Sequence, residues 1–439
     1  MKSKRAKVLH RVNGWPILRH VLRATTELAP SRFLVVVGIG NGAQAVRKEF
    51  SEWPVEFIEQ REQLGTGHAV SQAYGHVSGD FLLIVPGDLP LLTSQVLSRL
   101  ISHHNEQRAD LAVLSMIPAT PGAYGRLKRD TSGHPVKIVE ERDATDEEFD
   151  IAEVNSGIYC VRNDEFLWLA LRSLDAGNAQ GEYYLTDLVE HYHHAGKHVT
   201  AIKATDPQQV MGVNSRSELA VADRSMRLRK AGELMAGGVT IVDPESAYIE
   251  PDVKIGPDTV ILPGTHLSGG TTVGSNCTLG PETWIDASQV EDEVGIRYSV
   301  IESARVRTGT TIGPYSHLRP GADVGPVARI GNFVEVKAAR LRRGVKAGHL
   351  TYLGDSDVGE NVNIGAGTIT CNYDGKAKHR TVIKDGAFIG SNTSIVAPVT
   401  IGERAIIGAG STITEDVPSE ALALGRARQV NKRKKEEVE

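Results

Sequence analysis

The sequence has 439 residues, and at roughly 150 residues per domain this length predicts two or three domains. Its 49 Lys and Arg residues against 54 Asp and Glu residues give a net charge of −5, which argues against a protein built to bind nucleic acid or coat an anionic membrane. Three widely spaced cysteines form neither a disulfide framework nor a zinc-binding spacing, and no apolar run approaches the ~20 residues of a membrane span. We therefore expect a cytoplasmic protein with small-molecule partners, and neither nucleic acid nor membrane.

The chain opens with the basic segment MKSKRAKVLH. Asn-Gly and Pro interrupt the residues that follow, so the opening lacks the continuous apolar stretch of a signal peptide. We therefore do not interpret it as a targeting sequence.

Residues 1–214 alternate short apolar runs with amphipathic stretches. Strands are predicted at 32–38, 55–60, 80–88, 110–116 and 156–161, and a helix is predicted at 94–107. Strands that alternate with helices favour an α/β domain with a Rossmann-like sheet, mixed or mostly parallel, that is covered on both faces. A helical linker is predicted at 215–238, because Ser215 and Glu218 form a capping box and two glycines end the helix.

From residue 239 onward, aliphatic residues recur every six positions in separate runs: one ends at Ile285, the next begins at Val294 and slips in register after Val336, and the spacing returns at Val358 and again at Ile383. They are Ile255, Ile261, Leu267, Val273, Leu279, Ile285, Val294, Val300, Val306, Ile312, Leu318, Val324, Ile330, Val336, Val358, Ile364, Ile383, Ile389, Ile395, Ile401, Ile407 and Ile413. A spacing of six is typical of a parallel β-helix whose triangular turn has three six-residue sides. Cys277 falls where a small inward residue is expected. Breaks at 340–355 and 371–380 predict loops, where function tends to lie.

The string VPGD ends in Asp88, after an apolar run and a Pro-Gly turn. This puts a carboxylate past the carboxyl end of a predicted strand, where open α/β sheets bind ligands. One carboxylate with phosphate oxygens and water suits Mg²⁺. Asp88 could instead cap a helix, and Asn214 could either cap the linker helix or complete the metal site with a neutral oxygen.

Two strings in the second half are long and specific, GHLTYLGD (348–355) and NIGAGTITCNYDG (363–375). With LGTG, VPGD, YGR and IVEERDAT upstream, residues 1–214 resemble a sugar-phosphate nucleotidyltransferase domain, and residues 239–430 resemble a left-handed β-helix acyltransferase. The whole chain resembles the bacterial bifunctional N-acetylglucosamine-1-phosphate uridylyltransferase/glucosamine-1-phosphate N-acetyltransferase family. The resemblance implies synthesis of UDP-N-acetylglucosamine, with acetyl-CoA and UTP as co-substrates and Mg²⁺ as cofactor. The predicted domains are thus 1–214 for uridylyl transfer and 239–439 for N-acetyl transfer.

That family begins with a strand and a Gly-rich LAAGxGTRM-like loop, followed by SxxPKVLH. This chain starts at the Met of that pattern and has Ala6 where the family usually has Pro. The loop's N–H groups would cradle the nucleotide triphosphate, and the strand would lie inside the sheet. We therefore expect that the natural product begins upstream and that Met1 is an internal methionine.

For the first half, the resemblance implies a nucleotide site, an amino-sugar site and a metal site. Lys7 would neutralise the phosphates; Gln60, Gly65 and Thr66 would read uracil; Gly125, Glu140 and Asn155 would hold the sugar; and Asp88 and Asn214 would bind Mg²⁺. The reaction would be an in-line attack on the α-phosphorus of UTP, driven by positioning and charge neutralisation.

For the second half, the task is acetyl transfer from a thioester to an amine that must first lose a proton. His349, in the string GHLTYLGD, is the candidate base. The resemblance implies that Arg319, Lys337, Tyr352 and Asn363 hold the sugar phosphate, and that Ala366, Asn372, Tyr373, Ser391, Ala409 and Arg426 line the acetyl-CoA groove. Tyr373 could instead merely pack.

The resemblance also implies a homotrimer, because the family closes the groove beside one β-helix with a neighbouring subunit. Two alternatives remain open. The chain could be an acetyltransferase whose truncated nucleotidyl half is inactive, or a non-catalytic assembly or regulatory subunit. The combination of His349, Lys337 and Arg319 disfavours the second alternative, because a scaffold needs no base beside a phosphate clamp.

Overall fold

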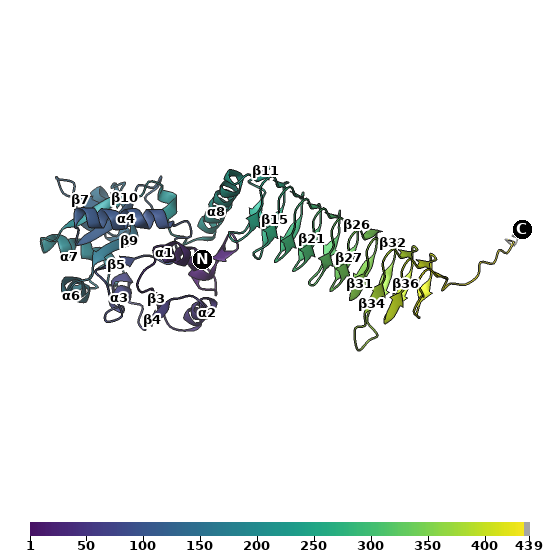
Figure 1. Cartoon of the computed structure of the whole chain (residues 1–439). Coiled ribbons are helices and arrows are strands. Elements are labelled where there is room, and N and C mark those ends of the chain that lie inside the picture. Colours follow the sequence, from purple (N-terminus) through teal and green to yellow (C-terminus); the bar gives the residue numbers. More distant parts are fainter. Residues whose placement is uncertain (434–439) are drawn as a thin grey trace, which may run out of the picture. The chain divides into compact units, whose positions relative to one another are not determined.

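A computed structural model of the chain describes residues 1–433, so the last residues of the predicted C-terminal tail, 434–439, lie outside the described part. The chain divides into two compact units, Met1–Met226 and Arg227–Glu439 (Figure 1). The division falls within helix α8 (Arg216–Ala236). No helix among residues 1–433 is both long and apolar enough to cross a membrane.

The first unit contains a mixed sheet whose strand order is β10-β6-β9-β7-β8, with β5 also paired to β9. These strands are β5 (Phe81–Ile84), β6 (Leu111–Met116), β7 (Arg126–Arg129), β8 (Pro135–Val139), β9 (Val154–Arg162) and β10 (Val199–Lys203). Two further strands, β3 (Leu34–Val37) and β4 (Glu56–Glu59), form a separate parallel pair, and β1 (Arg11–Val12) and β2 (Trp15–Pro16) form a small antiparallel pair.

The sheet of this unit is mixed, which is one of the two predicted arrangements, and it is not mostly parallel. β6 and β10 are parallel, but β9 runs antiparallel to β5, β6 and β7. An apolar run indicates a buried strand without indicating its direction, because both kinds of pairing bury the same side chains. The nine-residue β9 therefore accounts for the mixed sheet, since it pairs with β5 along one edge and β6 along the other.

Helices cover both faces of the six-stranded sheet, as predicted. Successive residues of β6 point to opposite faces, so Ala112 and Leu114 share a core with Leu97 of α4, while Leu111 and Val113 pack in the core that holds α6 and α7. The helix predicted at 94–107 is confirmed as α4, and Thr93 caps it by accepting the N–H of Val96. The helices of this unit are α1 (Ile17–Thr26), α2 (Asn41–Glu49), α3 (Thr66–Ser71), α4 (Ser94–Gln107), α5 (Asp146–Phe149), α6 (Glu165–Ser173) and α7 (Leu188–His194).

The capping box predicted for the linker helix is present at the start of α8. The hydroxyl of Ser215 accepts the N–H of Glu218, and the carboxylate of Glu218 accepts the N–H groups of Ser215 and Asn214. These contacts satisfy donors that a helix start otherwise leaves unpaired.

The second unit is a parallel β-helix. Among residues 1–433, its short strands stack into sheets of eleven, ten and nine strands, which begin at β11 (Thr240–Ile241), β12 (Tyr248–Ile249) and β13 (Lys254–Ile255). Every pairing between them is parallel, as in Val260 with Thr278, and Figure 1 shows the turns stacked from β11 to β36. The inward aliphatic residues form one continuous core, and Cys277 is buried in it as predicted.

The six-residue spacing fails at two places for the same reason. Val300 is 39% exposed and Ile301 points inward instead. Residues 340–355 are not a loop, because β28 (Arg340–Leu341), β29 (Lys346–His349) and β30 (Tyr352–Gly354) continue the helix, with Ala347 buried at the inward position. Some sides of the turn have five residues rather than six, which shifts the inward residue by one.

The loop predicted at 371–380 is confirmed. It leaves the β-helix between β33 (Ile369–Cys371) and β34 (Thr381–Ile383) and projects beside β34 in Figure 1.

Candidate active sites

The β-helix carries a row of residues along one corner that contains the candidate base. Each member directly precedes a residue with a left-handed backbone, which turns the chain from one sheet to the next. The row is Asn332, His349, Ala366, Ser391 and Ala409. Three of the residues predicted to line the acetyl-CoA groove therefore lie in line with His349, on successive turns.

His349 lies at the end of β29 and is exposed. Its Nδ1 is 2.5 Å from the side-chain oxygen Oδ1 of Asn332, which occupies the same position one turn earlier at the end of β26 (Arg329–Asn332). One ring nitrogen is thus engaged by a neighbour, and Asn332 is a site residue that the sequence analysis missed.

Positive charges gather on the adjoining sheet. Arg319 donates to Glu335 at 2.7 Å, and Lys337 lies two residues further along the same strand, β27 (Glu335–Lys337). The ammonium of Lys378, and after it the charge of Arg319, lowers the pKa of Lys337 below its usual value. Cations held this close together favour binding of a dianion such as a phosphate monoester.

Lys378 comes from the projecting loop and was not predicted. The carboxylate of Asp374 shapes this loop, because it accepts the N–H groups of Lys376 and Ala377 and contacts His379 Nε2 at 2.7 Å. These hydrogen bonds hold the pKa of Asp374 far below its usual value. The basic string KAKHR within a break of the repeat was the available signal for Lys378.

The remaining residues predicted for acetyl transfer lie around these groups. Tyr352 pairs with Glu335 on the adjacent turn. A Cβ on Gly354 would lie 2.3 Å from the hydroxyl of Tyr352. Asn363, in β32 (Asn363–Ile364), pairs with Lys346 on β29. Those two residues therefore belong to the sheets on either side of the His349 corner.

The residues predicted for coenzyme binding fall in two places. Asn372 is buried and donates its amide N–H to the carboxylate of Asp355, whereas Tyr373 is 61% exposed at the start of the projecting loop. Arg426 donates to the backbone carbonyl of Ala409 at 2.8 Å, so these two are in contact. The hydroxyl of Tyr373 donates to the carbonyl of Gly375, and its contact with coenzyme A stays a prediction.

In the first unit, three predicted residues meet through one ammonium group. Lys7 Nζ lies 2.5 Å from Asp88 Oδ2 and donates to Asn214 Oδ1 at 2.8 Å. The helix-capping alternatives for Asp88 and Asn214 are wrong, because Thr93 caps α4 and the hydroxyl of Ser215 accepts the N–H of Glu218 at the start of α8. Two oxygen donors that converge on one cation fit a small metal-binding site.

The residues predicted to read uracil also lie together. Gln60 is nearly buried and donates its side-chain amide to the carbonyl of Gly65 at 3.0 Å. Thr66 accepts the N–H of Leu185. Gly65 has a φ of +109° and a Cβ there would lie 2.7 Å from the carbonyl oxygen of Tyr183, so only glycine fits.

The predicted sugar residues form a third cluster. The N–H of Asn155 donates to the carbonyl of Gly125 at 2.8 Å, and a Cβ on Gly125 would lie 3.4 Å from the carboxyl group of Glu140. Burial raises the pKa of Glu140, and it raises the pKa of nearby Asp187 to about 6. Tyr124 links this cluster to the metal residues, since its hydroxyl accepts the N–H of Gly212, which lies beside Asp88.

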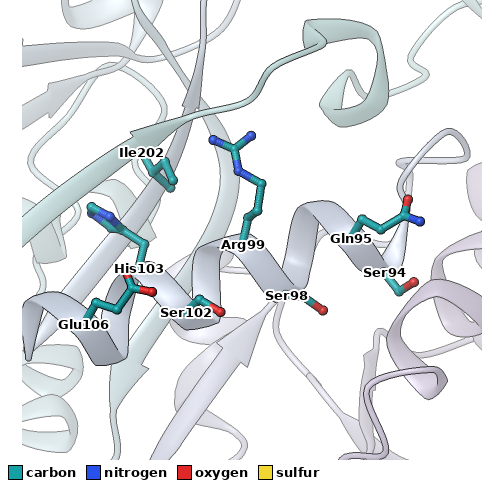
Figure 2. A pocket seen from close by; sticks show the side chains of 8 residues that line it. All are labelled: Ser94, Gln95, Ser98, Arg99, Ser102, His103, Glu106 and Ile202. Atoms are coloured by element: carbon teal, nitrogen blue, oxygen red, sulfur yellow. The ribbon is translucent and has the colours of Figure 1, made fainter.

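Two observations limit which ligands the protein itself supplies at these sites. Within residues 1–433, no three His, Cys, Asp or Glu side chains form a metal-binding group. A pocket of about 510 Å³ along α4, lined by Arg99, His103 and Ile202 among others (Figure 2), contains none of the predicted residues. A metal at Asp88 would therefore need ligands from substrate and water.

Comparison with known families first defines the class of protein. The MobA-like NTP transferase domain matches residues 1–146, and the bacterial transferase hexapeptide (six repeats) family matches residues 248–287 and 380–415. The mixed sheet and the β-helix thus define a two-part transferase, with a nucleotidyltransferase unit followed by a left-handed β-helix of hexapeptide repeats.

The particular family follows from full-length relatives. The chain is 48% identical to the bifunctional protein GlmU of Brevibacillus brevis over 98% of this chain and 93% of that protein. It is 48% identical to GlmU of Carboxydothermus hydrogenoformans, over 98% and 96%, and 46% identical to GlmU of a Geobacillus species, over 98% and 94%. The chain belongs to the GlmU family of bifunctional proteins.

Proposed function

We propose that this chain makes UDP-N-acetylglucosamine by two group transfers, one in each unit. The first transfer moves an acetyl group from acetyl-CoA to glucosamine 1-phosphate, and the second moves a uridylyl group from UTP to the product. The observation that carries this proposal is that each unit holds its own cluster of candidate site residues. In the second unit, His349 contacts Asn332, and Lys337 lies close to two other cations. In the first unit, Lys7 contacts both Asp88 and Asn214. Similarity to GlmU proteins over 98% of the chain does not favour the acetyltransferase-only or the non-catalytic alternative.

In acetyl transfer, His349 accepts a proton from the ammonium of glucosamine 1-phosphate. The free amine then attacks the carbonyl carbon of the thioester, the carbon–sulfur bond breaks, and coenzyme A leaves as a thiolate that takes up a proton. Arg319, Lys337 and Lys378 hold the sugar phosphate, since the charges of Lys378 and Arg319 already act on the ammonium of Lys337. General base catalysis of this kind contributes about 10²–10⁴-fold to the rate.

The same unit provides a groove for the coenzyme along the His349 corner. Ala366, Ser391 and Ala409 continue the row beyond His349, and small side chains there leave room for an extended ligand. Asn363 and Tyr352 hold the sugar, while Asn372, Tyr373 and Arg426 contact coenzyme A.

In uridylyl transfer, a phosphate oxygen of N-acetylglucosamine 1-phosphate attacks the α-phosphorus of UTP. The bond from that phosphorus to the bridging oxygen breaks, and pyrophosphate leaves. Gln60, Gly65 and Thr66 bind the uracil, and Gly125, Glu140 and Asn155 hold the sugar. Positioning and charge neutralisation supply the rate, so no protein nucleophile is needed.

We also propose that Asp88 and Asn214 bind Mg²⁺. Both offer oxygen atoms of the kind that Mg²⁺ prefers, and both already contact a cation, the Lys7 ammonium. When bound, Mg²⁺ would neutralise phosphate charge. Lys7 is then free to pair with the phosphates of the nucleotide.

A homotrimer is supported by an apolar ridge along the corner that holds His349. The ridge consists of Tyr298, Tyr315, Phe333 and Leu350, between 39% and 61% exposed, on four successive turns. Tyr315 and Phe333 stack at 5.5 Å, and Leu350 directly follows His349. Exposed apolar ridges of this length are typical of protein–protein interfaces. A second copy of the chain bound there would form the other side of the coenzyme groove. We also propose a cytoplasmic location, which suits the nucleotide and coenzyme A substrates of the two reactions.

Separate assays of the two reactions test the proposal. The purified protein with Mg²⁺ is expected to release coenzyme A from acetyl-CoA when glucosamine 1-phosphate is present, and pyrophosphate from UTP when N-acetylglucosamine 1-phosphate is present. Acetyl transfer alone would favour the acetyltransferase-only alternative. Absence of both activities would favour a non-catalytic subunit.

A further inference from the structure

The contact between Asn332 and His349 decides which ring nitrogen can act as a base. The two residues are 17 positions apart in the chain but form a registered pair on adjacent turns, β26 and β29. Their side chains meet at 2.5 Å, between Asn332 Oδ1 and His349 Nδ1. Because His349 is exposed, packing alone does not fix the orientation of its ring.

An amide oxygen can accept a hydrogen bond but cannot donate one. With Oδ1 facing the ring, Nδ1 must carry the proton of the neutral imidazole, which leaves the lone pair on Nε2. The reverse amide orientation would make Asn332 the donor, put the proton on Nε2, and remove the base from the outward side of the ring. The orientation of the Asn332 amide therefore decides which nitrogen of His349 can accept a proton.

We propose that Asn332 is a positioning residue that holds His349 in the tautomer protonated at Nδ1 and presents Nε2 to the amine of the substrate. The inference rests on the proposed role of His349 in acetyl transfer. In this role Asn332 acts on the reaction only through His349. Its contribution is to keep the exposed ring in the one protonation pattern and orientation that can accept the proton.

Two nearly isosteric substitutions separate the acceptor from the shape of the side chain. Asn332→Asp keeps an acceptor oxygen, whereas Asn332→Leu removes it. We expect Asn332→Leu to lower kcat for acetyl transfer about tenfold with little change in either KM, which is the loss expected for one hydrogen bond. Asn332→Asp should retain activity within a few-fold of the wild type. Thr311→Ala, at an exposed position one turn earlier, is the matched control and should leave kcat unchanged.

A double-mutant cycle distinguishes positioning of His349 from a general effect on the fold. Asn332→Leu should have no further effect in the His349→Ala background, because the group it orients is gone. Nitrogen NMR of ¹⁵N-histidine protein should show His349 protonated at Nδ1 in the wild type and a mixture of tautomers in Asn332→Leu. The His349→Ala spectrum assigns that signal.

Each result bears on one claim. If His349→Ala retains full acetyl transfer, the base is elsewhere and the proposed role of His349 fails. If His349→Ala is inactive but Asn332→Leu equals the wild type, or the NMR signal shows the proton on Nε2 in the wild type, the Asn332 inference alone is overturned. Equal losses caused by Asn332→Leu with and without His349 would also overturn it.

Discussion

The ammonium of Lys7 lies 2.5 Å from the carboxylate of Asp88, which is one of the two ligands proposed for Mg²⁺. The same ammonium donates to Asn214, so both proposed metal ligands are already engaged by a side chain of the protein. A metal ion and Lys7 cannot share these oxygens at such distances, because like charges repel strongly in a partly buried site. Metal binding must therefore release Lys7.

Lys7→Met should strengthen binding of a divalent metal in the absence of nucleotide while it lowers uridylyl transfer. We expect about tenfold tighter binding, since the competing ammonium is removed, measured by titration with Mn²⁺ and electron paramagnetic resonance. Lys4→Met, which alters an exposed lysine of the same segment, is the control. Equal or weaker metal binding by Lys7→Met would contradict the competition.

Lys378→Met should raise the KM for glucosamine 1-phosphate about tenfold and change kcat little, because the variant loses the proposed charge-assisted contact that binds the phosphate. Steady-state kinetics with varied sugar phosphate measure this. Lys376→Met changes another lysine of the same loop and should have little effect. A fall in kcat at unchanged KM would assign Lys378 a different role.

Phe333→Glu should break the proposed trimer, because a carboxylate in the middle of the apolar ridge cannot be buried without a partner. Sedimentation velocity is expected to show smaller species, with acetyl transfer lost and uridylyl transfer retained. Val327→Glu places the same charge on an isolated exposed apolar residue at another corner and serves as the control. If Phe333→Glu still forms a stable trimer, the subunit interface does not include this apolar ridge.

Asp187 predicts a pH dependence of stability in the first unit. Burial raises the pKa of this carboxyl from 3.8 to about 6 in the folded protein. Between these two values the folded state binds more protons than the unfolded state, so this group's contribution to stability decreases as the pH rises from about 4 to about 6. Asp187 makes no side-chain cap on α7, so removing its charge costs no capping hydrogen bond.

Asp187→Asn should therefore raise the unfolding temperature of this unit at pH 7.5 relative to the wild type, and the gain should shrink towards pH 4. Scanning calorimetry at both pH values measures the difference. Asp150→Asn, at an exposed position of the same unit, is the control. A gain that is the same at both pH values would show that the carboxyl charge is not responsible.

Local sequence was enough to predict the features that depend on near neighbours in the chain. The six-residue spacing predicts the β-helix because each inward residue is selected by its own side of the turn. Helix α4 and the capping box of α8 follow from signals within four residues. Asp88 could be assigned to the end of a strand because the apolar run and the Pro-Gly turn adjoin it.

The tertiary structure alone decided the features that depend on distant parts of the chain. The direction of β9, the inward position of Ala347, the contact of Lys378 with Lys337 and the pairing of Asn332 with His349 all arise between separate strands or turns. When one side of a β-helical turn has five residues in place of six, every later residue shifts by one position relative to the preceding turns. The local sequence pattern does not show that shift. Sequence by itself thus determined the kinds of structure and the chemical groups, whereas long-range packing decided which of those groups meet.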